Sequence, residues 1–178
     1  MNAHRKVLGC LVSAFATAAV LAAADTGSIS GFHCVEDGVA VGGQPTVEQV
    51  PTLAAKGYRT VINLRLASEF DAEPVAFAAR RAGMSYVSVP ISAKEPTDEA
   101  VEEFLRVTDD PGIYPIFIHC GSGNRAAALW MIRRVLREGW HIGIAISEAS
   151  AAGLQSEVMR DFALDYIQRH AMAQAALR

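Results

Sequence analysis

The sequence predicts a single α/β domain. The chain has 178 residues, 51% hydrophobic and 20% charged, which fits one globular domain with a real core rather than a disordered or repeat protein. After Asp25, short strand-like runs alternate with amphipathic stretches, the pattern of α/β proteins. The run 59–64 is mostly apolar, as expected of a strand covered on both faces. The net charge of −3 provides no excess of Lys or Arg and argues against nucleic-acid binding.

The strands are predicted from short runs rich in apolar and β-branched residues. In chain order they are 38–41, 59–64, 85–89 and 114–118. The turn Gly42-Gly43-Gln44-Pro45 closes the first strand, and Pro90 ends the third. The fourth strand runs directly into His119-Cys120.

The helices are predicted from apolar residues at helical spacing and from capping signals. They are expected at 46–57, 71–82, 97–106, 126–138, 143–152 and 156–170. Thr46 and Thr97 are candidate helix starts, and Pro74 fits the first turn of the second helix. Pro51 either begins the first helix or kinks it.

Residues 1–24 have the pattern of a secretory signal peptide. The basic pair Arg5-Lys6 precedes an uncharged stretch that ends in three alanines. We therefore expect cleavage before Asp25 and export, to the periplasm or out of the cell, with an uncleaved membrane anchor as the alternative. Residues 25–178 are then expected to form the single domain, because no linker, repeat or low-complexity segment interrupts them.

The segment 115–125, Pro-Ile-Phe-Ile-His-Cys-Gly-Ser-Gly-Asn-Arg, carries the main functional signal. A buried strand delivers Cys120 to a tight loop with two glycines, and a helix begins at the loop's far end. The loop N–H groups and the helix N-terminus converge on one point, where Cys120 is expected to be largely thiolate and Arg125 can clamp an oxyanion. The candidate oxyanion-binding residues are Gly121, Ser122, Gly123, Asn124 and Arg125.

This combination predicts transfer of an anionic group through a cysteine nucleophile. The competing interpretation is an inert buried thiol at a strand end, with the glycines and Arg125 merely shaping a turn. Ser122 is a candidate for a hydroxyl hydrogen bond that steadies the thiolate or assists its release. Otherwise it is simply a turn residue.

Several segments together resemble a known family. They are Gly42–Thr46, Gly57, Val61–Arg65, Val89-Pro90 and the run from His119 to Arg125. In them the sequence resembles the phosphatase-like domain family of beta-lactamase hydrolase-like proteins, which is similar to dual-specificity and protein tyrosine phosphatases. The resemblance covers about residues 32–155. It implies a cysteine-phosphatase-like fold: a central, mostly parallel sheet flanked by helices, with the cysteine loop between the C-terminus of a strand and the N-terminus of a helix.

The loop departs from the usual phosphatase signature in length. That signature has five residues between Cys and Arg, whereas residues 121–124 make four. The shorter loop loses a donor and resembles rhodanese-type sulfurtransferase loops, in which the Cys carries a sulfane sulfur. Gly121 argues the other way, because those loops commonly have a cationic residue next to the Cys. A sulfurtransferase that uses a Cys120 persulfide therefore stays open.

The general acid is the second departure. Dual-specificity phosphatases usually place an Asp shortly after the strand that ends Val-Pro, and here that position is near Ser92. A serine protonates a leaving alkoxide poorly. Glu95 or Asp98 can serve if the loop folds over Cys120. The alternative is that each of them is only a solvated charge in a loop or an acid that caps a helix.

Other polar residues have two interpretations each. The resemblance suggests that His119 tunes the nucleophile, and the alternative is a hydrogen-bonded histidine that fixes the loop. Asn63 and Arg65 end a strand expected beside the Cys120 strand, so they are candidates to frame the mouth of the site. Three arginines of the helix 126–138 are predicted to form a solvated face. They are Arg133, Arg134 and Arg137.

Cys34 and Cys120 are the two cysteines that remain after removal of the signal peptide. In an oxidising compartment a reversible disulfide between them would switch off the nucleophile. No metal is expected, because His33-Cys34 and His119-Cys120 are isolated pairs without the usual ligand spacing. No cofactor is expected either.

The first functional hypothesis is therefore an exported cysteine-dependent hydrolase of phosphatase fold, acting on an anionic small molecule or a phosphorylated substrate. The second is a sulfurtransferase on the same scaffold. The third is a catalytically inactive anion-binding module. We expect the protein to be attached to a membrane only if the N-terminal segment stays uncleaved.

Overall fold

A computed structural model describes residues 28–176, with side chains as far as residue 172. The predicted signal peptide, residues 1–24, lies outside the described residues. Within them, no helix is long and apolar enough to cross a membrane.

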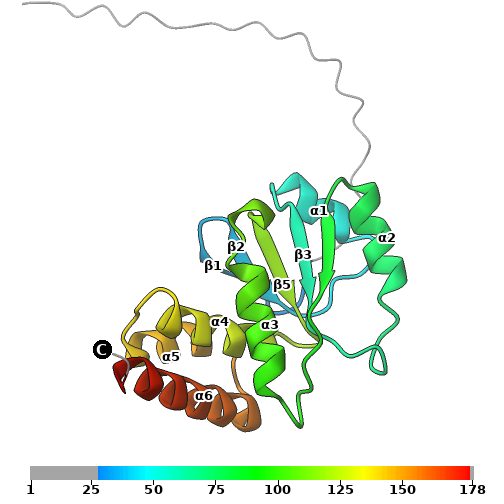
Figure 1. Ribbon diagram of the computed structural model, residues 1–178. Helices are drawn as coiled ribbons and strands as arrows, with labels where there is room; N and C mark the ends of the chain where they lie inside the picture. The colour runs from blue at the N-terminus through cyan, green and yellow to red at the C-terminus, as the bar shows by residue number, and fades with distance from the viewer. Residues whose placement is uncertain (1–27, 177–178) are drawn as a thin grey trace, which may run out of the picture.

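The centre of the fold is a five-stranded sheet (Figure 1). Its strands are β1 (His33–Glu36), β2 (Val39–Gly42), β3 (Thr60–Asn63), β4 (Ser85–Ser88) and β5 (Ile116–His119), in the order β1-β2-β5-β3-β4. Strand β1 pairs antiparallel with β2, and every other pair is parallel. The predicted α/β fold with a mostly parallel sheet is confirmed, although β1 is not among the predicted strands. A bulge between Cys34 and Glu36 interrupts its pairing.

Helices cover both faces of the sheet (Figure 1). They are α1 (Val50–Ala55), α2 (Glu73–Arg81), α3 (Asp98–Thr108), α4 (Asn124–Leu136), α5 (Ile142–Ala151) and α6 (Glu157–Ala176), with a 3-10 turn at Pro111–Ile113. Helices α1 and α2 pack on one face, whereas α3 and α4 pack on the other, and α4 in turn contacts α5 and α6.

Strand β5 shows how the two cores arise from alternation along one strand. All four of its residues are buried. Ile116 and Ile118 face the α3–α4 core, and Phe117 between them faces the α1–α2 core, where it stacks on Phe32 at 5.7 Å between ring centroids. A strand buried on both faces reads as a continuous apolar run, which is why it is visible in the sequence.

Capping residues set two of the helix starts. Thr97 caps α3 as predicted, accepting a hydrogen bond from the N–H of Ala100. Helix α1 begins at Val50 rather than Thr46, with Pro51 in its first turn. The residues before it form a turn in which Thr46 and Gln49 exchange side-chain and backbone hydrogen bonds at 2.9 and 3.3 Å.

The prediction that Arg134 is solvated is wrong. Its side chain is 2% exposed and binds three carboxylates, those of Glu36, Glu138 and Glu148, at 2.6–2.9 Å. Its guanidinium also stacks on Trp140, 4.1 Å from the ring centroid. A charged side chain this deeply buried needs such partners, and they come from β1, the turn after α4, and α5.

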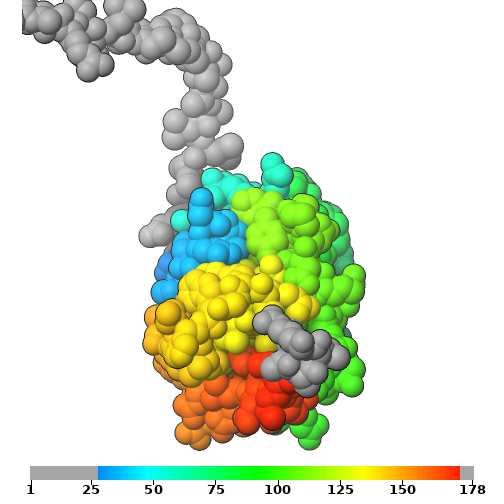
Figure 2. Space-filling view, turned by 60° about the vertical axis from the view of Figure 1, so that its left-hand side comes forward, coloured from blue at the N-terminus to red at the C-terminus, as the bar shows by residue number. Residues whose placement is uncertain are grey.

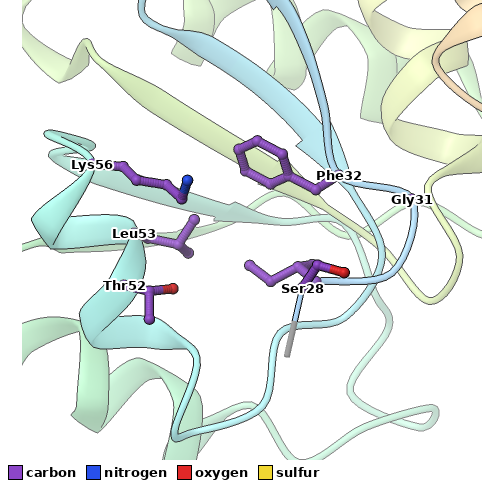
Figure 3. Close-up of a pocket in the computed structure, with 7 residues that line it drawn as sticks. Ser28, Gly31, Phe32, Thr52, Leu53 and Lys56 are labelled. Carbon is purple, nitrogen blue, oxygen red and sulfur yellow. The ribbon is translucent and has the colours of Figure 1, made fainter. Parts of the chain in front are cut away.

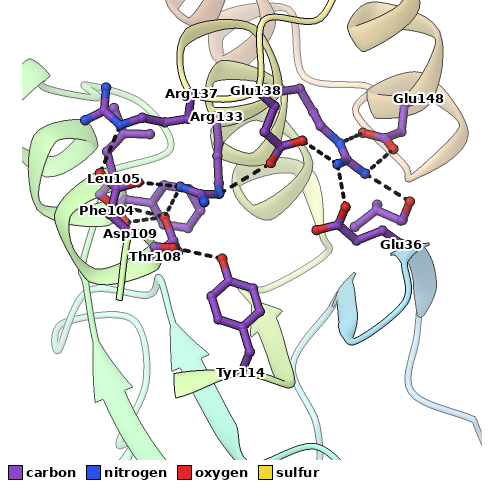
Figure 4. A network of polar contacts seen from close by, with 12 residues as sticks. Glu36, Phe104, Leu105, Thr108, Asp109, Tyr114, Arg133, Arg137, Glu138 and Glu148 are labelled. Carbon is purple, nitrogen blue, oxygen red and sulfur yellow. Dashed lines mark hydrogen bonds and ion pairs between the residues drawn. The ribbon is translucent and has the colours of Figure 1, made fainter. Parts of the chain in front are cut away.

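The prediction is also wrong for Arg133, whereas Arg137 is exposed, as predicted. Arg133 and Arg137 both bind Asp109, at 2.6 and 2.9 Å (Figure 4). The side chain of Arg133 is only 14% exposed, whereas that of Arg137 is 39% exposed, so only the part of this helix face at Arg133 and Arg134 is packed. In the space-filling view, β1 (blue) lies against the α4–α5 region (yellow), far along the chain from it (Figure 2).

Candidate active site

Cys120 follows directly on the buried strand β5, between two neighbouring strands. The N–H of Cys120 donates to the carbonyl of Gly42 at the end of β2, at 3.2 Å. On the other side, the carbonyl of His119 accepts from the N–H of Leu64, just beyond β3, at 2.9 Å. Hydrogen bonds to the chain at the ends of β2 and β3 therefore fix the position at which the chain leaves β5.

The loop after Cys120 turns the chain into α4. The N–H of Gly123 donates to the Cys120 sulfur at 3.1 Å. Gly123 is the N-cap of α4 and has a φ of 98°, which a glycine adopts without strain. The sulfur thus lies at the N-terminal end of a thirteen-residue helix, where negative charge is stabilised. Cys120 is 1% exposed and contacts the α3–α4 core on its other side.

Arg125 is turned inward, over the loop. Only 5% of the residue is exposed. Its guanidinium forms a two-pronged ion pair with Glu69, with both N–O distances at 2.8 Å. The Nη1 atom also donates to the carbonyl oxygens of Ile91 at 2.9 Å and Leu64 at 3.3 Å. A Cβ built on Gly121 would lie 3.8 Å from Nη2, so the guanidinium spans the loop.

These contacts decide which donors of Arg125 are left for a substrate. A guanidinium has five N–H bonds. Both of those on Nη1 and one of those on Nη2 are engaged by Glu69, Ile91 and Leu64. The Nε–H and the second Nη2–H form one edge, which suits two oxygens of a tetrahedral anion. Burial works to lower the pKa of Arg125, but Glu69 and the nearby Cys120 outweigh it and raise the pKa.

Glu69 is a site residue that is absent from the sequence-based candidates. It lies in the loop after β3, four residues beyond Arg65, and its side chain is 29% exposed. The hydrogen bonds from Arg125 hold the pKa of Glu69 below its usual value. An acidic residue shortly after the strand next to the Cys120 strand is the only sequence signal for it, and many loop acids share that signal.

His119 lies beneath the loop, on the opposite face of the sheet from Cys120. It is fully buried, stacks on Phe117 at 6.0 Å between centroids, and neither ring nitrogen has a hydrogen-bond partner in the described residues. Burial is the main cause that lowers the pKa of His119 to about 3, and the charges of Arg65 and Arg125 act in the same direction. His119 is therefore neutral at physiological pH. The predicted hydrogen bond that would let it fix the loop is not seen.

Asn124 ties the loop to the rest of the protein. Its side-chain oxygen accepts from the backbone N–H groups of Gln155 and Ser156 at 2.7 and 2.6 Å. Its amide nitrogen donates to the hydroxyl of Ser122 at 3.1 Å. The side chain of Asn124 is thus occupied by the α5–α6 connection and by Ser122. The backbone N–H of Asn124 belongs to the first turn of α4, at the N-terminal end of the helix.

Comparison with known families identifies this arrangement. The family described as "DSP-PTPase phosphatase fused to NAD+ Kinase" matches residues 18–163. The chain belongs to the DSP-PTPase phosphatase family. The predicted resemblance to dual-specificity and tyrosine phosphatases is thereby confirmed, and with it the assignment to phosphatase-like proteins.

Curated relatives agree with this family. The Beta-lactamase hydrolase-like protein of Xylella fastidiosa is 33% identical over 107 residues, which are 57% of this chain and 24% of the relative. The corresponding protein of Agrobacterium fabrum is 30% identical over the same length. The chain thus spans about a quarter of the length of the curated relatives it matches.

Solved structures show the same fold. The core catalytic domain of the PP-IP phosphatase SIW14 from S. cerevisiae, in complex with citrate, is 20% identical, with a TM-score of 0.66 over 84% of this chain and 96% of that one. TpbA from P. aeruginosa, in complex with pTyr, is 20% identical, with a TM-score of 0.61 over 77% and 82%. At these identities the likeness shows the cysteine-phosphatase fold alone.

The two predicted general acids of this phosphatase-family site lie in different surroundings. Asp98, at the start of α3, forms a two-pronged ion pair with Arg169 of α6 at 2.6 and 2.9 Å, and this lowers its pKa. A carboxylate held in this way is a poor proton donor, so the structure argues against Asp98. Glu95 is exposed and has no ion-pair partner within residues 28–176.

The loop that carries Glu95 adjoins the site. The hydroxyl of Ser92 accepts from the N–H groups of Lys94 and Glu95 at 3.2 and 3.0 Å, which closes a tight turn. The preceding carbonyl, that of Ile91, is the one bound by Arg125. Ser92 therefore shapes the turn, and Glu95 is the predicted acid that remains on the loop nearest the guanidinium.

The hypothesis of a disulfide between Cys34 and Cys120 is wrong. Both cysteines are free. Cys34 pairs with Ala40 across β1 and β2 and lies 3.9 Å from the Tyr58 hydroxyl, on the α1 face, whereas Cys120 packs on the α4 face. Two strand spacings of about 4.8 Å and three residues of about 3.3 Å along the strand put the Cα atoms well beyond the limit of about 7 Å for a disulfide.

Asn63 and Arg65 line a cavity of about 440 Å³ on the α2 side of the sheet, together with Phe70, Ser88 and Pro90. Arg65 reaches from this cavity to the carbonyl of Glu69 at 2.7 Å, so Glu69 separates the cavity from Arg125. This arrangement agrees with the prediction that Asn63 and Arg65 lie beside the mouth of the site.

A second cavity, of about 560 Å³, lies between α1 and the segment 28–32 (Figure 3). Its lining is mainly apolar, with Lys56 at one end, and includes no residue of the loop 119–125. It therefore does not belong to the anion site. No group of three or more metal-ligating side chains occurs in the part of the chain that the structure describes.

Proposed function

We propose that the protein is a cysteine-dependent phosphatase that uses a Cys120 thiolate. The observation that carries the proposal is that the Gly123 N–H donates to the Cys120 sulfur at 3.1 Å and that the buried Arg125 guanidinium lies near enough to Cys120 to interact with it electrostatically. Donors held in place before the substrate arrives stabilise the charge that develops in the transition state. An inert thiol would need neither a buried cation nor a glycine-capped helix start beside it.

In the proposed reaction the Cys120 thiolate attacks the phosphorus of a phosphate monoester. The S–P bond forms as the P–O bond to the leaving group breaks, and the leaving oxygen takes up a proton. Water then attacks the phosphocysteine, and the S–P bond breaks to release phosphate and restore the thiolate. Arg125 and the loop N–H groups hold the phosphoryl oxygens through both steps.

The position of the general acid limits the substrate class. With Asp98 bound to Arg169, exposed Glu95 is the one of the two predicted acids that remains available as a proton donor. A weakly assisted leaving group favours aryl phosphates, whose phenolate oxygens need little protonation. The structural neighbours were solved with pTyr and citrate, and their anionic ligands support an anionic, phosphorylated substrate for this chain.

The test is hydrolysis of para-nitrophenyl phosphate by the purified protein and by Cys120→Ser. Phosphate release should fall to background in Cys120→Ser. The matched control is Cys34→Ser, which removes the other free cysteine of residues 28–176 and should retain the wild-type rate. Equal loss in both variants, or release that survives in Cys120→Ser, would contradict the proposal.

A sulfurtransferase is the second candidate, and the four-residue spacing between Cys120 and Arg125 is the observation that favours it. In that case thiosulfate passes its outer sulfur to Cys120, sulfite leaves, and cyanide removes the sulfur as thiocyanate. Thiocyanate formation that disappears in Cys120→Ser, without phosphate release, would select this function. If neither activity exceeds the Cys120→Ser background while phosphate still binds, the protein is an anion-binding module.

We further propose that the protein is exported, on the composition of residues 1–24. The test is cell fractionation after expression of the full chain, with N-terminal sequencing of the product. A product in the periplasm or medium that begins at Asp25 is expected. A product of full length in the membrane fraction would instead support an uncleaved anchor.

A further inference from the structure

The cysteine loop, residues 120–123, packs against two other backbone segments. They are residues 42–44 at the end of β2 and the segment 28–31. Residues 42–44 are called the template segment here. The template segment forms backbone hydrogen bonds with both the loop and the segment 28–31, and Gly31 of the segment 28–31 also lies near the Ser122 carbonyl of the loop.

Every residue from Cys120 to Gly123 meets the template segment. The N–H of Cys120 donates to the Gly42 carbonyl, and the N–H of Gln44 donates to the Gly121 carbonyl, both at 3.2 Å. Ser122 lies opposite Gly43 in an antiparallel bridge. A Cβ built on Gly123 would lie 3.6 Å from the Gly42 carbonyl carbon. The loop thus pairs with the template like a short additional strand.

This pairing sets the direction of the loop amides. A trans peptide points its C=O and its N–H in opposite directions. Because the Gly121 carbonyl points toward Gln44, the N–H of Ser122, in the same peptide, points away from the template. In an antiparallel pair flanked by hydrogen bonds in this way, the groups of Ser122 itself also point outward. Consistent with this, the Gly43 N–H points away from the loop, to the Ser30 carbonyl at 2.8 Å.

The packing leaves no space for a side chain at position 43. A Cβ there would lie 2.9 Å from the Ser30 carbonyl oxygen and 3.1 Å from the Gly121 carbonyl oxygen. Both atoms belong to the backbone and lie on opposite sides, so neither can rotate away as a side chain would. By contrast, a Cβ on Gly121 would meet nothing closer than 3.8 Å.

We propose that Gly43 and the backbone N–H of Gln44 are positioning residues, which hold the Gly121 carbonyl back and thereby aim the Ser122 N–H at the bound oxyanion. The inference rests on the proposed function, because it names the residues that orient the oxyanion donors. It assigns a role to the Gly42-Gly43-Gln44 motif that neither the nucleophile nor Arg125 explains.

The first test is Gly43→Ala, with Gly143→Ala as the matched control. Gly143 lies in α5, away from the loop, and an added Cβ there would contact only the His141 ring at 3.4 Å. In Gly43→Ala we expect kcat/KM for para-nitrophenyl phosphate to fall by up to about a hundred-fold to a thousand-fold, the range for loss of one oxyanion donor. The inhibition constant of orthovanadate should rise by a similar factor. Gly143→Ala should change neither.

The second test removes the hydrogen bond from the Gln44 N–H and places the ring Cδ of a proline against the Gly121 carbonyl in its stead. Gln44→Pro deletes the N–H that binds the Gly121 carbonyl, whereas Gln44→Ala keeps it and loses the same side chain. The side-chain contact from Arg65 to the Gln44 oxygen, at 3.4 Å, is absent in both variants. Gln44→Pro should lose kcat/KM and vanadate affinity relative to Gln44→Ala. If Gly43→Ala does not fold, the comparison of Gln44→Pro with Gln44→Ala still tests whether the template segment positions the loop.

The outcomes separate this inference from the proposed function. If Gly43→Ala and Gln44→Pro melt earlier but keep wild-type kcat/KM and vanadate affinity, the template is only structural and the inference is overturned. If the wild type binds phosphate without hydrolysing it, and both variants lose that binding, the inference stands and the proposed function fails. If the wild type neither hydrolyses nor binds phosphate, both fail.

Discussion

Glu69 binds the Arg125 guanidinium through both carboxylate oxygens, each at 2.8 Å, although 56 residues separate the two in sequence. The ion pair is only partly exposed, with the two side chains at 29% and 6%. It turns one edge of the guanidinium away from solvent. Glu69 therefore determines which edge of Arg125 meets a substrate.

The first prediction concerns Glu69→Gln. Without the carboxylate, Arg125 loses its two-pronged partner and its orientation, and displacement of a clamp by about 1 Å can cost about a hundred-fold in rate. We expect kcat/KM to fall by between about ten-fold and about a hundred-fold. The control is Glu73→Gln, which removes an exposed partner of Arg80. Equal rates for the two variants would show that Arg125 needs no help from Glu69.

The second prediction separates Glu95 from Asp98. If Glu95 donates the proton, Glu95→Gln should slow hydrolysis of an alkyl phosphate more than that of an aryl phosphate, because an alkoxide needs the proton more. Asp98→Asn should leave both rates within about two-fold and cost about 1 kcal/mol or less of stability, as expected for an exposed ion pair. Steady-state rates with both substrates and thermal melting check this. A selective loss with the alkyl substrate in Asp98→Asn would reverse the assignment.

The third prediction concerns Arg134→Met. Its removal leaves the carboxylates of Glu36, Glu138 and Glu148 close together without the cation, and breaking a buried ion pair in this way costs about 3 kcal/mol. The free energy of unfolding in urea at pH 7 should fall by about that much, and by less near pH 4, where the carboxylates become protonated. Arg106→Met, which removes an exposed partner of Glu103, should change it by less than about 1 kcal/mol. A loss that does not depend on pH would exclude carboxylate repulsion as its cause.

The fourth prediction concerns the pH dependence that His119 imposes. Burial lowers the pKa of His119 to about 3, so the unfolded chain binds a proton more readily than the folded one between that value and the usual value of 6.5. Stability is therefore fully present above the usual value and is lost as pH falls below it, at about 1 kcal/mol per pH unit. His119→Gln should show a shallower loss between pH 6.5 and 4 in urea unfolding. Parallel curves for the two proteins would mean that His119 titrates normally.

Much of the fold was predictable because it depends on local pattern. Strands β3 and β5 are buried on both faces, and the runs that contain them are therefore mostly apolar. The glycines and Arg125 after Cys120 likewise mark a loop that leads into a helix, where Gly123 and Asn124 now begin α4. These features depend on a residue and its near neighbours, and so they can be read along the chain.

Other parts were not predictable for the same physical reason. Strand β1 has only four residues and alternates between half-buried and exposed positions, so its pattern is too weak to stand out. The burial of Arg134 depends on Glu36, which lies 98 residues away. When no partner is known, helical spacing alone predicts that an arginine lies on a solvated face.

By itself, then, the sequence determined the α/β class and the cysteine loop with its helix, which hold the residues proposed as nucleophile and anion clamp, because backbone preference and apolar periodicity act over a few residues. Only the tertiary structure decided the partners. The strand order β2-β5-β3 brings Gly42 and Leu64 to the two sides of the loop and Glu69 to Arg125, and the placement of α3 and α6 brings Asp98 to Arg169 rather than to the sulfur. Burial and hydrogen bonding between distant residues depend on how strands are ordered in space, which no local pattern encodes.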